Sequence, residues 1–480
     1  MLKIFIRITL LIFLASNIYA QNIRIPSAAG KFYPDDKKTL NSTLNKFLDR
    51  SETRKVSGDI NALIIPHAGI EYSGQVAAEA YKYVSNRKYD AVVIIAPSHF
   101  ESFPKVSIFP GNGLKTPLGT VNIHKELAES IKRSCEIVSF SNQGYYNEHA
   151  LEIQLPFIQT VLPGTPVVPL VMGYQNFGYS FYLGKSLAAA LKGRNILFVA
   201  STDLSHFHEY EEAKQLDKNI ADLISGYDPM LLSQKIFSGE AEACGGGPLI
   251  AVMTAAQLLG SNHAEVIRYA NSGDITNEKR SVVGYLSAVI TNSGNNNTKL
   301  SLYDRNIILD TAISTVNSVV RVQDLPKLPG VQGALSKNSG VFVTLKINGQ
   351  LRGCIGRIFA TEPLINAVQW SAKSAAVKDE RFFAVNEFEL PLLEYEVSIL
   401  SPMKLINDTE MIEIGRHGLF LVNGTRSGLL LPQVAVQNDL NRLDFLRHAS
   451  LKADLPADGW EYPSTFIFVF EADVFSRKGG

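Results

Sequence analysis

Short apolar runs alternate with helix-like stretches along the first half of the chain. The runs cover residues 62–65, 91–96, 167–172 and 195–200, and apolar residues recur at helical spacing between Val76 and Val84. Continuous apolar runs of this length are typical of strands that are buried on both faces of a parallel sheet. The pattern therefore predicts an α/β domain in which helices cover a largely parallel sheet.

Polar side chains follow three of these runs directly. His67 comes after the first run, His99 after the second, and the pair Asp203 and His206 after the fourth. In folds of this kind, ligands bind beyond the carboxyl ends of the strands, and these ends converge in space even when they are far apart in the sequence. We therefore expect the four side chains to share one site.

Cys244 stands before a glycine-rich run and a predicted helix that Pro248 opens and that ends near Leu259. A helix N-terminus favours the thiolate form of a nearby cysteine. Two imidazoles and a thiolate suit iron, copper or zinc, and they would leave positions open for a substrate. One alternative is that these His and Cys residues have only a structural role in the folded protein. Another is that the glycine run binds an anion. The pair Glu148 and His149 adds further ionisable groups.

The second half of the chain has a different pattern, beyond a polar run at residues 291–298 that predicts a linker. A helix is predicted over residues 302–320, and Asn348-Gly349 predicts a hairpin turn after the alternating strand 341–347. A second helix at about 362–377 comes before strand-like stretches at residues 395–400, 419–422, 429–431 and 466–470. This order of elements predicts an α+β second domain.

Composition narrows the class of protein. The chain has 480 residues with 46 basic and 46 acidic side chains, so charge gives no reason to expect a nucleic-acid partner. Three cysteines in so long a chain exclude a disulfide scaffold. A length of this size accommodates two or three domains.

The N-terminus has the pattern of a secretory signal. Lys3 and Arg7 precede an apolar run from Ile8 to Ala15, and Ala20 offers a small residue for cleavage. The run is shorter than the roughly 20 residues of a membrane span. We therefore expect residues 1–20 to be a signal peptide and the protein to be exported, either periplasmic or secreted. An uncleaved N-terminal anchor is the alternative.

Several motifs of the first half together resemble one known family. They are, in chain order, PHAGIEYSG, APSH, EHALEIQLPF, STDLSHF, CGGGP and SGDITNEKRSVVGY. Over residues 21–292 the chain is similar to the Memo-like family, system protein B of the AmmeMemoRadiSam group. The resemblance implies an α/β fold related to LigB-type class III extradiol dioxygenases. It also implies an iron or copper site at His67, His99 and Cys244, with Asp203 and His206 nearby.

This implied site suggests a chemistry. Two imidazoles and a thiolate on iron would resemble the arrangement of two His and one carboxylate found in non-haem iron oxygenases. His206 would move a proton if Asp203 fixes its tautomer. The same ligands on copper would form a redox or copper-holding site.

The second half carries a separate candidate in the run Leu351-Arg352-Gly353-Cys354-Ile355-Gly356. Strand alternation places Arg352 and Cys354 on one face, where a cation would favour a nucleophilic thiolate. The alternative is that Cys354 is packed and inert, because no general base lies nearby in the sequence. This run and four other motifs, DERF, EVSILSP, GLLLPQV and KA, resemble the AMMECR-type domain, system protein A of the same group, over residues 302–478. Residues 293–301 then form the linker.

These observations predict a metal-dependent redox or oxygenase-like protein that uses iron or copper. The AMMECR-type domain would be an accessory that binds or presents an unknown small-molecule or peptide substrate. The resemblance also implies a radical-SAM protein as partner, and we expect no nucleic acid. The alternative is a non-catalytic protein that holds metal or binds a peptide. A metal-free hydrolase that uses Cys354 ranks last.

Overall fold

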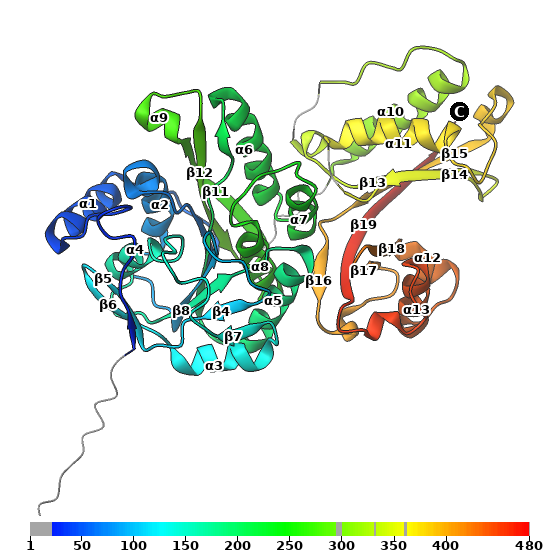
Figure 1. Cartoon of the computed structure of the whole chain (residues 1–480). Helices are drawn as coiled ribbons and strands as arrows, with labels where there is room; N and C mark the ends of the chain where they lie inside the picture. Colours follow the sequence, from blue (N-terminus) through cyan, green and yellow to red (C-terminus); the bar gives the residue numbers. More distant parts are fainter. Residues whose placement is uncertain (1–21, 294–299, 331–332, 360–361, 480) are drawn as a thin grey trace, which may run out of the picture.

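The computed structural model describes residues 22–293, 300–330, 333–359 and 362–479, which form two domains that lie side by side (Figure 1). The predicted signal peptide and most of the predicted linker fall outside these ranges. Within the described ranges, we find no helix with the length and apolar character needed to cross a membrane.

Four parallel strands form the centre of the first domain. Their order across the sheet is β2 (Ile60–Ile65), β9 (Ile196–Ser201), β3 (Ala91–Pro97) and β8 (Val167–Met172). These are the four apolar runs, so the prediction of parallel strands is confirmed at the centre. It is wrong at the edges, where β12 (Val282–Thr291) pairs antiparallel with β2, and β4 (Val106–Ile108) pairs antiparallel with β8. β4 has only three residues, too few to give a recognisable run.

Helices cover both faces of this sheet. Alternate residues of each strand point to opposite faces, so Ile64 and Val93 pack on one side while Leu63 and Val92 pack on the other. The helices of this domain are α1 (Lys37–Arg50), α2 (Ile70–Val84), α3 (Lys125–Ser134), α4 (Gln154–Val161), α5 (Phe177–Ala190), α6 (Tyr210–Ser225), α7 (Pro229–Phe237), α8 (Gly246–Leu258) and α9 (Ser272–Thr276). Its other strands are β1 (Ile23–Arg24), β5 (Gly113–Thr116), β6 (Gly119–Asn122), β7 (Val138–Phe140), β10 (His206–His208) and β11 (His263–Asn271).

The second domain contains an antiparallel sheet, as the α+β pattern predicts. The strands follow the order β14 (Gln350–Arg357), β13 (Val341–Ile347), β15 (Leu393–Leu400), β19 (Phe466–Lys478), β17 (His417–Asn423) and β18 (Arg426–Leu430), with β16 (Lys404–Ile406) paired to β19. Its helices are α10 (Leu302–Val320), α11 (Leu364–Val377), α12 (Pro432–Gln437) and α13 (Arg442–Lys452).

Local sequence signals explain two of these elements. α10 begins after Ser301, whose side chain accepts a hydrogen bond from Asp304 N, while the Asp304 carboxylate accepts one from Ser301 N in return. Between β13 and β14, Asn348 and Gly349 both have positive φ, which the type I′ turn requires. The predicted helix and hairpin are therefore confirmed.

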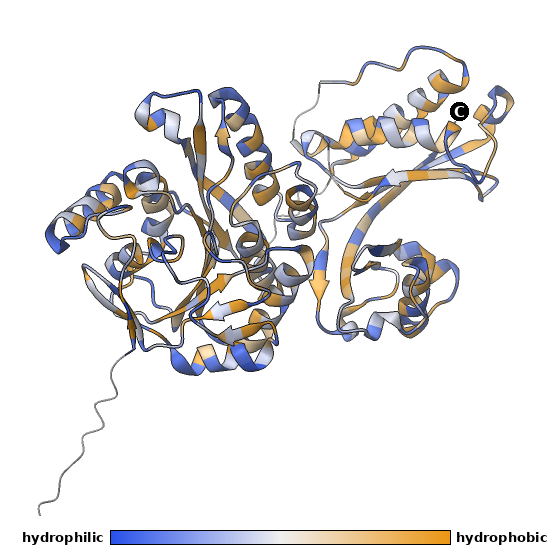
Figure 2. Cartoon of the chain, viewed as in Figure 1, coloured by the Kyte–Doolittle hydropathy of each residue, from blue (hydrophilic) through white to orange (hydrophobic). Residues whose placement is uncertain are grey.

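Apolar packing continues across the boundary between the domains. Figure 2 shows hydrophobic central strands in the first domain and a hydrophobic β16 at the junction. The largest buried cluster contains side chains of α5 and α8 together with residues of β16, β17 and β19. The two domains therefore share one core instead of meeting through polar surfaces.

Gly353 allows α11 to pack closely on β14. A Cβ atom at this position would lie 2.2 Å from the carbonyl oxygen of Ala375 in α11. We expect Gly353→Ala to destabilise the protein by about 1–3 kcal/mol, because the helix must move away from the sheet. Chemical unfolding of the variant measures the difference. Gly330→Ala is the control, because a Cβ there meets nothing within 4 Å. Equal stability of the two variants would contradict this account.

Candidate metal centre

The central strands bring the predicted site residues together. His67 follows β2, Asp203 follows β9 and His99 follows β3, and β9 lies between the other two strands. Their carboxyl ends therefore meet at one edge of the sheet. The rings of His67 and His99 lie 5.1 Å apart, centroid to centroid. The predicted convergence of these residues is confirmed.

A third histidine joins them. One ring nitrogen each from His67, His99 and His149 lies within 4.8 Å of the others, a spacing at which they could hold a metal ion. His149 comes from the segment between β7 and α4, which is not part of the parallel sheet. The sequence pattern marks His149 only as a nearby ionisable group and does not predict its place in this cluster. The sequence did contain one indication, because the acidic residues Glu148 and Glu152 stand close to His149 in the chain.

Fixed acceptors orient two of the imidazoles. His67 Nδ1 lies 3.0 Å from Ser201 Oγ, and His99 Nδ1 lies 3.0 Å from Glu148 Oε1. Glu148 also accepts a hydrogen bond from His99 N at 2.6 Å. Contacts of this kind at one ring nitrogen leave Nε2 available, as is usual for histidines that bind metals. These two histidines fit the role of metal ligands.

His149 is held by stacking. Its ring lies 4.1 Å from that of Phe32 and 4.9 Å from that of His99, with interplanar angles of 23° and 24°. Its buried Nδ1 has no hydrogen-bond partner within the described residues. Burial lowers the pKa of His149 to about 4 and holds the pKa of His67 well below its usual value. Both rings are therefore neutral near pH 7, which is the form that binds metal.

Cys244 lies at the same centre. Its Sγ is 3.1 Å from His67 Nε2 and accepts a hydrogen bond from Asp203 N at 3.2 Å. The residue after Cys244 is a glycine for a steric reason. A Cβ atom at Gly245 would lie 2.2 Å from the carbonyl oxygen of Ser201. The predicted helix is confirmed, but it begins at Gly246, two residues before Pro248.

The expectation of a favoured thiolate at Cys244 is wrong for the metal-free protein, because burial raises the pKa of this thiol. The hydrogen bond from Asp203 N favours the anion less than burial disfavours it, and two N–H groups next to the cysteine have other acceptors. Gly245 N donates to Thr202 Oγ1 and Gly247 N donates to Gln175 Oε1. A bound metal ion would have to displace the thiol proton.

Asp203 and His206 have different partners from those expected. Asp203 Oδ1 accepts a hydrogen bond from His67 N at 2.7 Å, and its Oδ2 lies 3.9 Å from His67 Nε2. The carbonyl oxygen of Leu204, and not Asp203, lies 2.8 Å from His206 Nδ1. Leu204 therefore fixes the tautomer of His206 and leaves Nε2 free to accept a proton. Asp203 instead shapes the loop that holds His67, and burial raises its pKa to about 7.

A buried acid connects the N-terminal segment to this centre. The Glu152 carboxylate, which is fully buried, pairs with Arg24 and accepts hydrogen bonds from Ala28 N and the Tyr33 hydroxyl at 2.8 and 2.6 Å. The same segment carries Phe32, whose carbonyl oxygen accepts a hydrogen bond from Ile70 N at the start of α2. The N-terminal segment therefore packs against both His149 and the loop of His67.

Comparisons with known proteins match each domain to a family. The sequence model of the Memo-like protein family matches residues 24–289, more than half of the chain. The chain belongs to the Memo-like family. Residues 309–475 match the AMMECR1 family, so a Memo-like domain is joined here to an AMMECR1 domain.

Relatives named MEMO1 family proteins align with the Memo-like domain along almost their whole length. The chain is 36% identical over 272 residues to MTH_45 of Methanothermobacter thermautotrophicus, covering 55% of this chain and 98% of the relative. It is 34% identical over 287 residues to MJ0403 of Methanocaldococcus jannaschii, covering 56% and 99%.

Two solved structures are also similar to parts of this chain. The uncharacterized protein PH0010 from Pyrococcus horikoshii shows 33% identity and a TM-score of 0.35, over 36% of this chain and 90% of that one. JW3007 from Escherichia coli K12 shows 13% identity and a TM-score of 0.35, over 48% and 99%.

In the AMMECR1 domain, the surroundings of Cys354 do not activate its thiol. Burial raises the pKa of Cys354, and the Thr344 hydroxyl donates a hydrogen bond to its Sγ at 3.2 Å. Arg352, expected beside the thiol, instead forms an ion pair with Glu389. Arg381 donates a hydrogen bond to the backbone carbonyl of Cys354 and pairs with Asp379, and its charge lowers the pKa of the thiol less than burial raises it. The arrangement favours a packed, inert cysteine.

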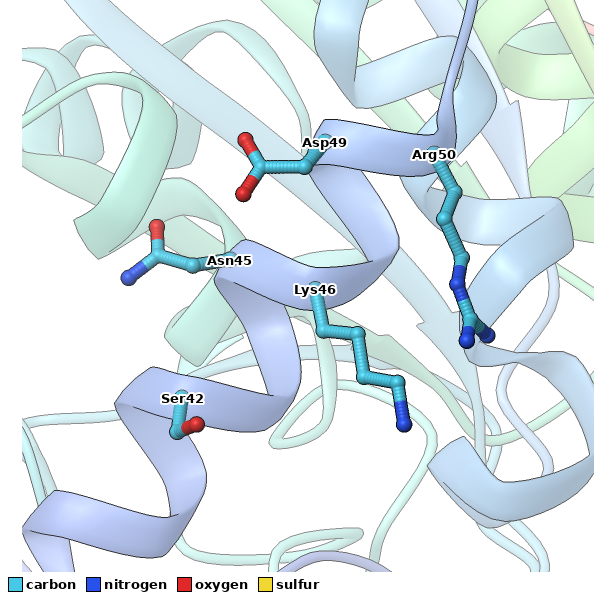
Figure 3. Close-up of a pocket in the computed structure, with 5 residues that line it drawn as sticks. All are labelled: Ser42, Asn45, Lys46, Asp49 and Arg50. Atoms are coloured by element: carbon cyan, nitrogen blue, oxygen red, sulfur yellow. The ribbon is translucent and has the colours of Figure 1, made fainter.

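The surface hollow in Figure 3 offers no second centre in the Memo-like domain. Its lining side chains all come from α1, namely Ser42, Asn45, Lys46, Asp49 and Arg50. Asp49 and Arg50 point in different directions, so these groups do not converge on one ligand.

The buried pair of Glu152 and Arg24 should be essential for stability. We expect Glu152→Gln to lower the free energy of unfolding by about 3 kcal/mol, because it leaves the Arg24 charge without its counter-charge. Urea unfolding measures the loss, with Glu129→Gln on the exposed side of α3 as control. Equal unfolding midpoints for the two variants would contradict this role.

Asp379 should make stability depend on pH. The hydrogen bond from Arg381 lowers the pKa of Asp379 to about 2, and the carboxylate also accepts one from Cys354 N at 2.8 Å. Its stabilisation is therefore present above the usual carboxyl pKa and is lost as pH falls toward 2. We expect Asp379→Asn to cost about 1–2 kcal/mol at neutral pH, with a smaller difference in acid. Unfolding at several pH values measures this, and a difference independent of pH would contradict it.

Proposed function

We propose that the Memo-like domain is a metal-dependent redox or oxygenase-like protein that holds iron or copper. The observation that carries the proposal is the convergence of three imidazoles, with His67 and His99 oriented through Nδ1. His67 and His99 are ligands in both possible sets, and the third ligand is either Cys244 or His149. The proposed likeness to LigB-type class III extradiol dioxygenases points to the same chemistry.

This donor set suits a transition metal. Imidazole is a common ligand of iron and copper, and the thiol of Cys244 adds a soft donor that copper favours. When bound, the metal would supply redox chemistry or bind oxygen and a substrate atom at its open positions. The protein would supply the orientation of the ligands through Ser201 and Glu148.

His206 is the proposed proton carrier of this site. Its Nε2 is unprotonated while Nδ1 donates to Leu204, and burial lowers its pKa, so the ring is neutral near pH 7. A neutral imidazole with a fixed tautomer is ready to accept a proton from a bound substrate. Asp203 contributes by holding the backbone of His67.

A non-catalytic protein that holds metal or binds a peptide is the second candidate function. One observation favours it: aromatic side chains next to the centre point into solvent. Phe100 is 58% exposed and Phe207 is 75% exposed, and Phe207 has a left-handed backbone with φ of 65°. Exposed aromatic side chains commonly anchor a peptide.

We also propose an exported location and a radical-SAM partner. Support for export comes from Lys3, Arg7 and the apolar run that follows them. Support for the partner comes only from the AmmeMemoRadiSam resemblance, and the two proposals hold together only for a partner that is exported as well. In this proposal the AMMECR1 domain is an accessory for an unknown small-molecule or peptide substrate.

Elemental analysis of the anaerobically purified chain tests the metal centre. We expect about one iron or copper per chain, and the loss of most of this metal in His67→Ala and His99→Ala, because each change removes a proposed ligand. His448→Ala, which changes an exposed histidine of the AMMECR1 domain, should keep the metal.

Cys244→Ser and His149→Ala then identify the third ligand, because the variant that loses more metal has lost it. Full metal in both His67→Ala and His99→Ala would show the site to be wrong. No stoichiometric metal in the unchanged protein would favour the peptide-binding candidate.

A further inference from the structure

Aromatic side chains join the AMMECR1 domain to α5 of the Memo-like domain. The Phe466 ring lies 5.7 Å from that of Phe177 and 6.1 Å from that of Phe181, and the Phe468 ring lies 5.4 Å from that of Phe181. Phe466 is 6% exposed and Phe468 is fully buried. Figure 1 shows β16 at the boundary of the two domains. The domains are therefore docked firmly.

The same domain also covers α8. Residues 246–256 of this helix are all buried, so it has no polar stripe that could face water. A helix that is hydrophobic on every side must be covered on every side. The central strands cover one side of α8, α5 covers another, and β16 packs against the helix as well. The AMMECR1 domain thus completes the burial of α8.

Cys244 is attached to both of these helices. It comes two residues before α8, which begins at Gly246. The side-chain amide of Gln175, two residues before α5, donates a hydrogen bond from Nε2 to the carbonyl oxygen of Cys244 at 2.9 Å. Its Oε1 accepts one from Gly247 N at 2.8 Å. The cysteine loop is therefore held by the start of α8 and by Gln175 next to the start of α5, and the AMMECR1 domain packs against both helices.

We propose that docking of the AMMECR1 domain on α5 and α8 positions Cys244, with Gln175 as the positioning residue between α5 and the cysteine loop. The functional consequence rests on the proposed metal centre: if Cys244 is a ligand there, the AMMECR1 domain regulates that ligand. The positioning itself needs no metal. Loosening the junction frees α5 and α8, the Gln175 amide loses its two partners, and the Cys244 thiol becomes mobile.

The test measures the metal-free full chain. Cys244 alkylation is followed by mass spectrometry, with buried Cys135 as an internal reference, and hydrogen exchange is followed at the Gly247 amide. Phe466→Ala loosens the junction, because its ring contacts both lie on α5. Gln175→Leu removes the two amide hydrogen bonds and leaves the junction intact. Phe475→Ala is the matched control, since it truncates the same residue type in β19 at a partly buried position that packs against the core of the AMMECR1 domain, away from the junction.

We expect Phe466→Ala and Gln175→Leu each to raise the rates of Cys244 alkylation and Gly247 exchange by roughly tenfold, and Phe475→Ala to leave both unchanged. An increase in Gln175→Leu alone would overturn the role of the AMMECR1 domain. Equal increases in all three variants would overturn it too, because general loosening would then explain them. If the protein binds no metal but the alkylation and exchange rates change as expected, the proposed function is wrong and this inference still holds.

Discussion

The position of β9 between β2 and β3 is the constraint on which the candidate centre depends. Because these three strands run parallel, their carboxyl ends meet, and the loops of His67, Asp203 and His99 must share one small volume. Asp203 then bonds to the backbone of His67 and donates its own N–H to Cys244 Sγ. The order of the strands therefore sets the distances between groups such as His67 and Asp203, which are 136 residues apart in the sequence.

Burial decides the chemical state of these groups. His67 is buried and His149 is largely buried, so the neutral imidazole is favoured and these rings can approach one another without repulsion between charges. The same burial keeps the Cys244 thiol protonated in the absence of metal. The rings of His67 and His149 are therefore in the neutral form that binds a cation.

The AMMECR1 domain is part of the same physical unit. Its β16 and the phenylalanines of β19 fill space against α5 and α8, which would otherwise expose apolar surface. The fusion therefore does more than keep two domains near each other, as a flexible linker would. It places the core of one domain directly behind the loop that carries a candidate ligand of the other.

The sequence by itself determined the elements and part of the site. Continuous apolar runs identified the four central strands, and the polar residues directly after them identified His67, His99 and Asp203, because both signals are local. Tertiary structure decided the rest. His149 reaches the centre through a loop outside the parallel sheet, Arg352 pairs with Glu389 instead of approaching Cys354, and Leu204 instead of Asp203 orients His206. These outcomes, like the raised pKa of Cys244, depend on burial and on contacts between distant segments, which hydrophobic periodicity does not encode.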